Sequence, residues 1–288
     1  TEIYTLSLHD ALPISVTHIE KTVSAITQAV QDAERQSGIK VRAVNVGIAG
    51  DHIQSFQSRG VIAISNPENE IGRKDVERLL QDTKRVALPS DRRIIHVIPQ
   101  EFIVDGQDGI YDPVGMAGVR MEANVHIITG GITPVQNIYR CVERAGLEIN
   151  DLVLEPLAST YAVMSEDEKE VGVVLVDIGG GTTDIAIFEG RTIRHTAVLA
   201  IAGKKVTEDI RKGLGILNDE AERLKREHGY AYMPEIVDDM PIPLRPIGGR
   251  GAVEITRGLL CQIIQPRMEE ILEIVALEIK RSGYRSEE

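Results

Sequence analysis

The sequence VGVVLVDIGGGTTDIAIFEG, residues 171–190, reads as a strand, a glycine turn and a second strand. Its first part, Val171–Val176, is an almost continuous apolar and β-branched run, which is typical of a strand buried on both faces. Asp177 ends that run, and three glycines then permit backbone conformations and close approaches that a side chain would prevent. Consecutive N–H groups in such a turn can surround an anion, and the hydroxyls of Thr182 and Thr183 add donors. The stretch therefore predicts a phosphate-binding hairpin with a carboxylate beside it.

Spacing excludes two other phosphate-binding motifs. The pattern GxxxxGK[ST] does not occur in the sequence. GxGxxG fails because Asp184 occupies the place of its last glycine, and because a strand follows the turn where that motif needs a helix. A glycine hairpin that only reverses the chain is the simpler alternative, but it needs one or two glycines rather than three.

Composition predicts a cytoplasmic protein of ordinary globular type. The chain has 288 residues, 42% of them hydrophobic and 26% charged, and this length favours two domains. A net charge of −12 and the absence of Trp argue against nucleic-acid binding. No apolar run approaches the roughly 20 residues of a membrane span, and no secretory signal is recognisable. We expect Cys141 and Cys261 to be buried free thiols, with a disulfide between them as the alternative.

The alternation of helix and strand patterns predicts an α/β chain. Helices are expected at residues 17–36, 73–86, 133–145, 156–164, 206–214, 219–227 and 253–281. Strands are expected at residues 41–48, 60–65, 93–104, 119–129, 151–154, 171–176, 182–188 and 191–201. Thr133 and Asn218 are the predicted N-caps of their helices, residues 105–118 an irregular loop, and residues 166–170 a charged surface crossing. Residues 248–251, Gly-Gly-Arg-Gly, favour a flexible connection over an anion-binding loop.

Several motifs resemble a known superfamily and one family within it. DIGGGTTD at 177–184 is similar to the second phosphate loop of the superfamily that contains actin, sugar kinases and heat-shock chaperones, and LEPLAST at 154–160 to its connecting helix. The runs at 96–130 and 141–159 closely resemble the bacterial cell-division family FtsA. The similarity covers residues 17–288, and the β-α-β-β insert distinguishes FtsA from the other members.

The resemblance implies an actin-like (ribonuclease H-like) α/β fold with two lobes, and with ATP and Mg²⁺ between them. The implied parts are an unmatched segment at 1–16, a first-lobe core at 17–56 and 136–167, the inserted subdomain at 57–135, a second-lobe core at 168–202 and 277–288, and an outer subdomain at 203–276.

The resemblance also implies roles for individual residues. The phosphates would be held by Gly179, Gly180, Gly181, Thr182 and Thr183, and by a second glycine turn at Gly203. Asp177 would hold Mg²⁺ through water, and Glu155 would orient the water that attacks the γ-phosphate. Ala202 stands where the family has glycine, and it fits only with a negative φ.

Glu222 and Lys225 match the pair that contacts ribose and adenine in the chaperone branch. Their spacing alone equally fits a solvated i,i+3 ion pair.

The implied function is an ATP-binding, filament-forming adaptor, at most a slow ATPase, which links the FtsZ ring to the inner face of the cell membrane. Further division proteins would bind the inserted subdomain, and the membrane would be reached through a C-terminal amphipathic helix that the sequence lacks. The alternatives are an actin-like pilus-assembly protein, and a phosphotransferase or chaperone-type ATPase on the same fold. The insert argues against a chaperone, and no substrate carboxylate of a kinase is recognisable.

The resemblance fails at both ends of the sequence. Residues 1–16 offer no Asp-x-Gly turn where the first phosphate hairpin belongs. We interpret them as sequence unrelated to the family, with a divergent start of the family as the alternative. The glycine-rich adenine loop expected after residues 253–281 is also missing. We therefore expect this polypeptide to bind ATP more weakly than a full-length relative does.

Overall fold

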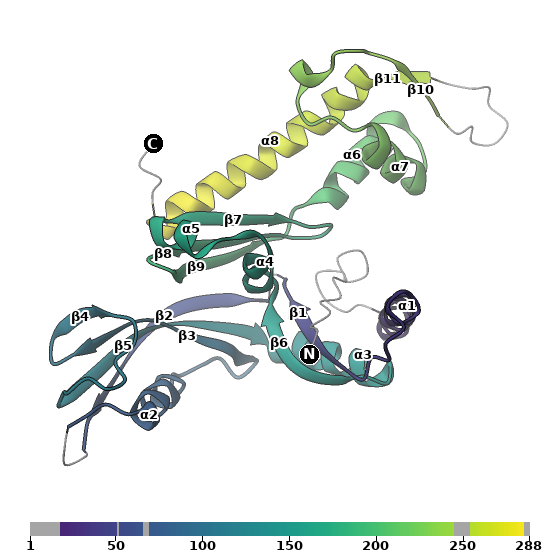
Figure 1. Ribbon diagram of the computed structural model, residues 1–288. Helices are drawn as coiled ribbons and strands as arrows, with labels where there is room; N and C mark the ends of the chain where they lie inside the picture. Colours follow the sequence, from purple (N-terminus) through teal and green to yellow (C-terminus); the bar gives the residue numbers. More distant parts are fainter. Residues whose placement is uncertain (1–17, 51, 66–68, 245–253, 285–288) are drawn as a thin grey trace. The chain divides into compact units, whose positions relative to one another are not determined.

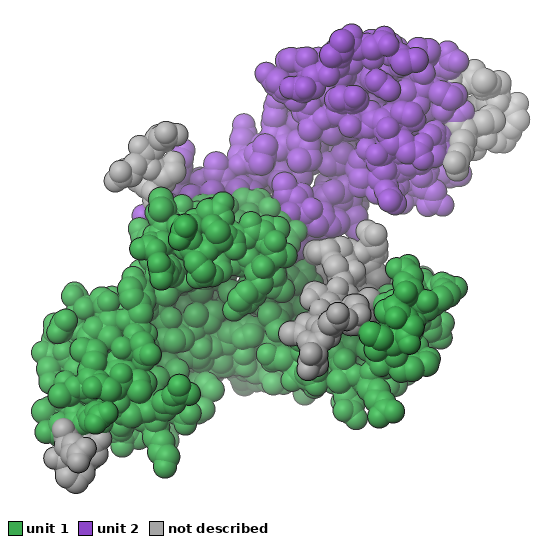
Figure 2. Space-filling view, in the orientation of Figure 1, with its two compact units in different colours: residues 1–177, 184–198 green, residues 178–183, 199–288 purple. Residues whose placement is uncertain are grey.

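The computed structural model describes residues 18–50, 52–65, 69–244 and 254–284 (Figure 1). The predictions for residues 1–16 and 248–251 lie outside the described residues. The chain divides into two compact units, shown in Figure 2. Unit 1 comprises Thr1–Asp177 and Asp184–Val198, and unit 2 comprises Ile178–Thr183 and Leu199–Glu288. The lobe boundaries implied by the sequence stay a prediction.

The core of unit 1 is a parallel pair of strands with helices packed against it. Strands β1 (Ala43–Ile48) and β6 (Glu148–Leu154) pair in parallel, and helices α1 (Ile19–Ser37) and α3 (Ile132–Arg144) pack together. The hydrophobic core includes Ile26, Val30, Ile48, Val135 and Leu154. Gly38 follows the last residue of α1 and caps it with φ +72°, the left-handed conformation expected of a glycine just beyond a helix.

The inserted subdomain is an antiparallel sheet with one helix. Its strands are β2 (Gln54–Ala63), β3 (Arg92–Val104), β4 (Gln107–Ile110) and β5 (Arg120–Gly131), in the spatial order β2-β5-β3-β4, and α2 (Arg73–Thr83) contacts β2 and β5. The prediction of an irregular loop over 105–118 is wrong, because β4 forms within it. Asp105 (φ 49°) and Gly106 (φ 90°) make the tight turn between β3 and β4. The Asp-Gly dipeptide was the hairpin signal in the sequence.

Polar side chains of the insert reach strand β9 (Thr192–Leu199) of the same unit. Gln100 Nε2 donates to the carbonyl of Ile193 at 2.8 Å, and Ser55 Oγ donates to the carbonyl of Thr196 at 3.2 Å. His126 Nε2 lies 3.3 Å from Thr196 Oγ1. These contacts satisfy polar groups that would otherwise be buried without partners.

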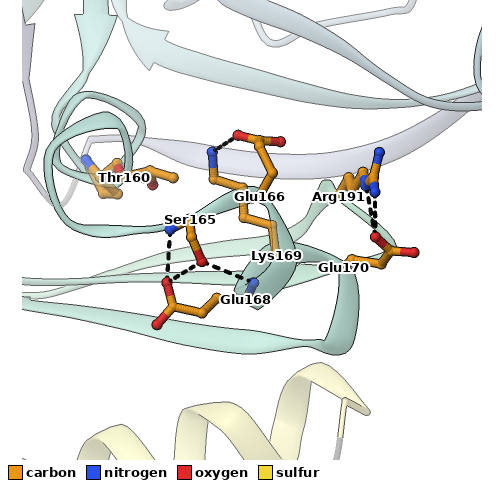
Figure 3. Close-up of polar contacts among 8 residues, drawn as sticks. Thr160, Ser165, Glu166, Glu168, Lys169, Glu170 and Arg191 are labelled. Carbon is orange, nitrogen blue, oxygen red and sulfur yellow. Dashed lines mark hydrogen bonds and ion pairs between the residues drawn. The ribbon is translucent and has the colours of Figure 1, made fainter.

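Residues 166–170, predicted as a charged surface crossing, form a short helix. Helix α4 (Glu155–Val163) is followed by α5 (Glu166–Val171), which begins with a capping box. Ser165 Oγ accepts the N–H of Glu168 at 3.3 Å, and the Glu168 carboxylate accepts the N–H of Ser165 at 2.8 Å (Figure 3). The Lys169 side chain is buried and donates to Glu166 at 2.7 Å. The Ser-x-x-Glu spacing was the sequence signal for this helix.

The glycine hairpin lies in a three-stranded sheet of order β7-β8-β9. Strand β8 (Thr183–Glu189) is central and buried from Thr183 to Phe188. Strand β7 (Val173–Ile178) lies at the edge and is only half-buried, so the prediction that it is buried on both faces is wrong. An apolar run cannot distinguish an edge strand from a central one, because both can have one covered face.

Unit 2 is mostly helical. Helices α6 (Gly203–Leu214), α7 (Asn218–His228) and α8 (Arg257–Ser282) pack around a core that includes Val206, Ile210, Leu224, Leu260 and Ile264. The short 3₁₀ helix η1 (Met233–Glu235) and the antiparallel strand pair β10 (Pro241–Pro243) and β11 (Glu254–Thr256) also belong to the described part of this unit. None of the helices in the described ranges is both long and apolar enough to cross a bilayer.

Two predicted N-caps are wrong by one or two positions. The N-cap of α3 is Gly131 rather than Thr133, and the N-cap of α7 is Leu217 rather than Asn218. Neither position has a side-chain capping hydrogen bond. The two cysteines are buried and free, as expected.

Candidate functional site

The glycine turn is fixed to the start of α6 through its carbonyl groups. Gly179 N–H donates to the carbonyl of Thr182 at 2.9 Å, which closes the turn. The carbonyls of Gly179 and Gly180 accept the N–H groups of Gly203 and Lys204 at 3.1 and 2.8 Å. All of these residues belong to unit 2. The two glycine turns that the sequence predicts to act together are therefore hydrogen-bonded to each other.

The N–H groups of the turn are the donors that an anion requires. Within the described residues, Gly180 and Gly181 donate no hydrogen bond through their N–H groups, and both are partly exposed. None of Gly179, Gly180 and Gly181 has a left-handed φ, so backbone handedness is not the reason for glycine here. The absence of side chains leaves the backbone open to a ligand, next to the N-terminus of a 12-residue helix.

Thr183 differs from the prediction of a hydroxyl that donates to phosphate. The residue is fully buried, and its Oγ1 donates to the carbonyl of Ile201 at 2.7 Å. A hydroxyl has one proton, so this bond removes the donor that the sequence assigned to phosphate. Thr182 is partly exposed and lies in the turn itself.

Gly203 and Ala202 fit their positions for different reasons. Ala202 has φ −168°, an extended conformation that any residue adopts, so alanine is tolerated where the family has glycine. A Cβ at Gly203 would lie 3.3 Å from the carbonyl oxygen of Gly179 and 3.6 Å from Lys225 Nζ. Glycine at 203 therefore allows α6 to approach the turn closely.

Glu222 and Lys225 form more than a solvated pair on one helix. Lys225 Nζ lies 2.7 Å from Glu222 Oε2, 3.0 Å from Thr207 Oγ1 and 3.3 Å from the carbonyl of Gly203. Thr207 Oγ1 donates to Glu222 at 2.6 Å. Burial raises the pKa of Glu222, but the bonds from Lys225 and Thr207 outweigh it, so the net pKa is lowered. The cluster joins α7 to the first turn of α6, and sequence reasoning missed Thr207.

Lys204 is a further residue that the sequence analysis did not single out. Its side chain is exposed at the N-terminus of α6, and its own N–H is bound to Gly180. Within the described residues Lys204 makes no ion pair, whereas the neighbouring Lys205 pairs with Glu208 at 3.0 Å. An uncommitted cation beside the turn adds to its attraction for anions. The signal in the sequence was the lysine directly after Gly203.

Asp177 and its partner lie in unit 1. Ser159 Oγ, on α4, donates to Asp177 Oδ2 at 2.8 Å. The described residues contain no cluster of three or more His, Cys, Asp or Glu that could hold a metal. Mg²⁺ in nucleotide sites needs only one or two carboxylates in addition to phosphate and water. A single oriented carboxylate at Asp177 therefore fits Mg²⁺ bound through water.

Glu155 lies at the start of α4, also in unit 1. Its side chain packs over Gly47 on β1, where an added Cβ would stand 2.9 Å from Glu155 Cγ and 3.2 Å from its Oε1. The side chain is half-buried. Gly47 is thus a residue that the position of Glu155 requires, and it was not identified from the sequence.

Comparison with known proteins shows which family this sequence resembles. The sequence matches the family described as "SHS2 domain inserted in FTSA" over residues 50–129, and the family described as "Cell division protein FtsA" over residues 174–281. It is 44% identical over 269 residues to the cell division protein FtsA of Pseudomonas aeruginosa, covering 93% of this chain and 64% of the relative. It is 42% identical over 269 residues to FtsA of Bacillus subtilis, covering 93% of this chain and 61% of the relative.

A solved structure shares the fold. The PilM-PilN type IV pilus biogenesis complex matches with a TM-score of 0.62 at 16% sequence identity, over 99% of this chain and 70% of that one. This likeness concerns the fold alone, and it confirms the predicted actin-like α/β class. The chain spans less than two thirds of the two bacterial relatives described above. By its sequence matches on both the insert and the region of the glycine hairpin, the chain belongs to the FtsA family.

Proposed function

We propose that this chain binds ATP at the glycine turn and acts in bacterial cell division as an actin-like adaptor. The observation that carries the nucleotide proposal is the pair of N–H groups of Gly180 and Gly181, which donate to no other group in the described residues. A turn fixed through its carbonyls keeps these donors in place for phosphate oxygens, so little ordering is needed on binding. Lys204 supplies positive charge beside them.

The nucleoside end of the ligand would meet the α6–α7 cluster. Glu222 and Lys225 lie next to Gly203, and Gly203 is bonded to the turn, so both ends of the proposed site are on connected elements. A carboxylate with a lowered pKa stays ionised at neutral pH and can accept hydrogen bonds from ribose hydroxyls. Thr183 serves in this proposal as a brace for the turn rather than as a ligand.

Mg²⁺ would be held through water by Asp177, and Glu155 would hold a water as general base. When bound, Mg²⁺ neutralises charge on the phosphate oxygens. Ser159 orients one oxygen of Asp177, which leaves the other available for metal-bound water. The half-buried Glu155, packed on Gly47, has a restricted side chain, as a general base requires.

The cellular role is proposed from the family. Relatives named cell division protein FtsA cover nearly all of this chain, and the proposed location of this chain is the inner face of the cytoplasmic membrane at the division site. The proposed partners are FtsZ, further copies of the same protein in filaments, and later division proteins at the inserted subdomain. Nucleotide would control assembly more than turnover.

A fluorescent ATP analogue titrated into the chain tests the nucleotide site. Gly181→Val places a side chain over the free N–H groups and should weaken binding at least tenfold. Ala63→Val, an exposed change of similar size on the insert, should leave binding unchanged. Equal affinity in Gly181→Val and wild type, with unchanged melting temperatures, would overturn the site. Co-sedimentation with FtsZ polymers tests the adaptor role. The role would be refuted if a version of this protein as long as its relatives did not co-sediment with FtsZ.

A further inference from the structure

The junction between β6 and α4 is held by a side chain of the inserted subdomain. Leu154 is the last residue of β6 and the N-cap of α4, and its side chain is 1% exposed. Its N–H donates to Nε2 of His96 on β3 at 3.1 Å. No side chain caps the N-terminus of α4 at this residue. The bond to His96 is therefore a side-chain contact that holds the backbone immediately before Glu155.

A β-bulge places His96 at this junction. Ile94 pairs with Thr129 on β5, but His96 pairs with Ile128, so Ile95 is an extra residue on β3. Ile95 packs against the hydrophobic core of unit 1. An extra residue changes the direction in which the following side chain points, and bulges of this kind are frequent beside functional sites. The irregularity in β3 thus serves to direct the imidazole.

The hydrogen bond fixes the chemical state of the imidazole. Nε2 can accept a hydrogen bond only when it carries no proton, so His96 must be neutral and carry its proton on Nδ1. Burial lowers the pKa of His96, and the carboxylate of Asp151 on β6 opposes this shift. The residue paired with it on β5, Ile128, is uncharged. His96 therefore remains an acceptor at neutral pH.

We propose that His96 is a positioning residue for Glu155, which it orients by holding the N–H of Leu154. This inference rests on the proposed role of Glu155 as general base. Glu155 directly follows Leu154 and packs on Gly47 of β1, so its direction depends on the backbone at the strand end. Without the bond, a buried N–H loses its partner, and the first turn of α4 moves to satisfy it. The inserted subdomain would then help to position Glu155 through the side chain of His96.

The tautomer gives the first test. A long-range ¹H–¹⁵N spectrum of the histidine rings in the 288-residue chain should show His96 with an unprotonated Nε2 at pH 7. A protonated Nε2 would overturn the proposal, because the bond to Leu154 could not form.

A matched pair of variants gives the second test. His96→Leu removes the acceptor, whereas His96→Gln restores an oxygen acceptor of similar reach. Hydrogen exchange at Leu154 should accelerate about tenfold in His96→Leu and much less in His96→Gln. The ¹³C signal of the Glu155 carboxyl and its titration should shift in His96→Leu and return towards wild type in His96→Gln. His18→Leu, which removes an exposed histidine side chain elsewhere, should change neither signal.

These readouts separate the proposal from the proposed function. A Glu155 signal unchanged in His96→Leu would reduce His96 to a purely structural role and refute positioning, whether or not ATP is hydrolysed. If the chain hydrolyses ATP, His96→Leu should lower kcat with little change in KM, and should add no further loss to Glu155→Gln. Absence of ATP binding in wild type, together with a shifted Glu155 signal, would refute the proposed function alone.

Discussion

Gly47 on β1 lies directly against the side chain of Glu155, so closely that a Cβ at position 47 would stand 2.9 Å from Glu155 Cγ. The contact explains a glycine inside a strand, where glycine ordinarily weakens pairing. Gly47 precedes Ile48, which pairs with Leu154 at the end of the neighbouring parallel strand, and Glu155 directly follows Leu154 at the start of α4. The strand pair therefore determines the room that this carboxylate has.

Gly47→Ala should displace Glu155 and destabilise unit 1. Overpacking of this kind costs about 1–3 kcal/mol of unfolding free energy. In a Glu155→Ala background the same substitution should cost less than half as much, because the clashing Cγ is gone. Urea unfolding of the four proteins in this double-mutant cycle measures the coupling. Additive effects of the two substitutions would show that the contact does not constrain Glu155.

Ser159→Ala should weaken binding of ATP only when Mg²⁺ is present. The hydroxyl orients Asp177, which we assign to metal-bound water, and its loss should reduce affinity for Mg–ATP about three- to tenfold. Affinity for ATP in excess EDTA should not change. Ser37→Ala, at an exposed serine whose hydroxyl bonds only to the backbone of Ala33 and Ile39 at the end of α1, is the control. An equal loss with and without Mg²⁺ would contradict the assignment.

Lys204→Ala should weaken ATP binding about two- to fivefold, the range expected of an exposed charge acting near an anion. The effect should shrink in high salt, because mobile ions screen such a charge. Lys212→Ala changes an exposed lysine at the other end of the same helix and is the matched control. Equal affinities of the two variants at low salt would remove Lys204 from the site.

Thr207→Val should lower the free energy of unfolding by about 1–2 kcal/mol, since the residue is 4% exposed and its hydroxyl joins Glu222 and Lys225. Thr207→Ser keeps the hydroxyl and should recover most of this loss. ATP affinity should decrease in the same order, from wild type through Thr207→Ser to Thr207→Val. A valine variant as stable as wild type would show that the cluster does not hold α7 to α6.

The stability of unit 1 should fall between pH 6.5 and 4 because of His126. The residue is 2% exposed on β5, and burial, followed by the charge of His195, lowers its pKa to about 4. Its neighbours Thr196 on β9 and Ile98 on β3 carry no charge. The unfolded chain takes up the proton on this histidine near pH 6.5. The contribution of neutral His126 to the free energy of unfolding is therefore complete above that pH and declines as the pH falls towards 4.

Urea unfolding at pH 7.5 and 4.5 measures this contribution. Between these two pH values, the free energy of unfolding of His126→Gln should fall by roughly 2–3 kcal/mol less than that of wild type, even if the variant is less stable at pH 7.5. His18→Gln should follow the wild-type curve. Parallel pH profiles of wild type and His126→Gln would contradict the lowered pKa.

The sequence predicted most elements of regular structure because their periodicity is local. Helices α1 and α2 and strands β3 and β5 begin and end within a few residues of their predicted bounds. The errors concern what lies next to an element. An apolar strand such as β7 can be an edge strand, and the caps of α3 and α7 depend on how the preceding chain enters the helix. Two missed elements, β4 and α5, had local signals in Asp105–Gly106 and in Ser165–Glu168.

The residues of the candidate site could be proposed from the sequence only where they belong to a recognisable motif. The glycine hairpin and the Glu222–Lys225 pair could be identified from sequence, and the structure brings both to the start of α6. Gly47, Ser159 and His96 could not be identified, because each matters through a partner distant in sequence. The burial of Thr183 was equally hidden, since a hydroxyl pattern does not reveal which carbonyl it meets.

The fold of helix α5 should protect the acidic, lysine-containing stretch Glu166–Val171 from proteolysis. The carbonyls of Lys169 and Glu170 accept the N–H groups of Arg191 and Gly190 at 3.0 and 3.2 Å, and the Lys169 side chain is buried. A trypsin-like protease needs an extended peptide around its target lysine. Here the backbone is helical and is hydrogen-bonded to the turn between β8 and β9. The rate of cleavage after Lys169 would therefore measure how often α5 separates from the β8–β9 turn and unfolds.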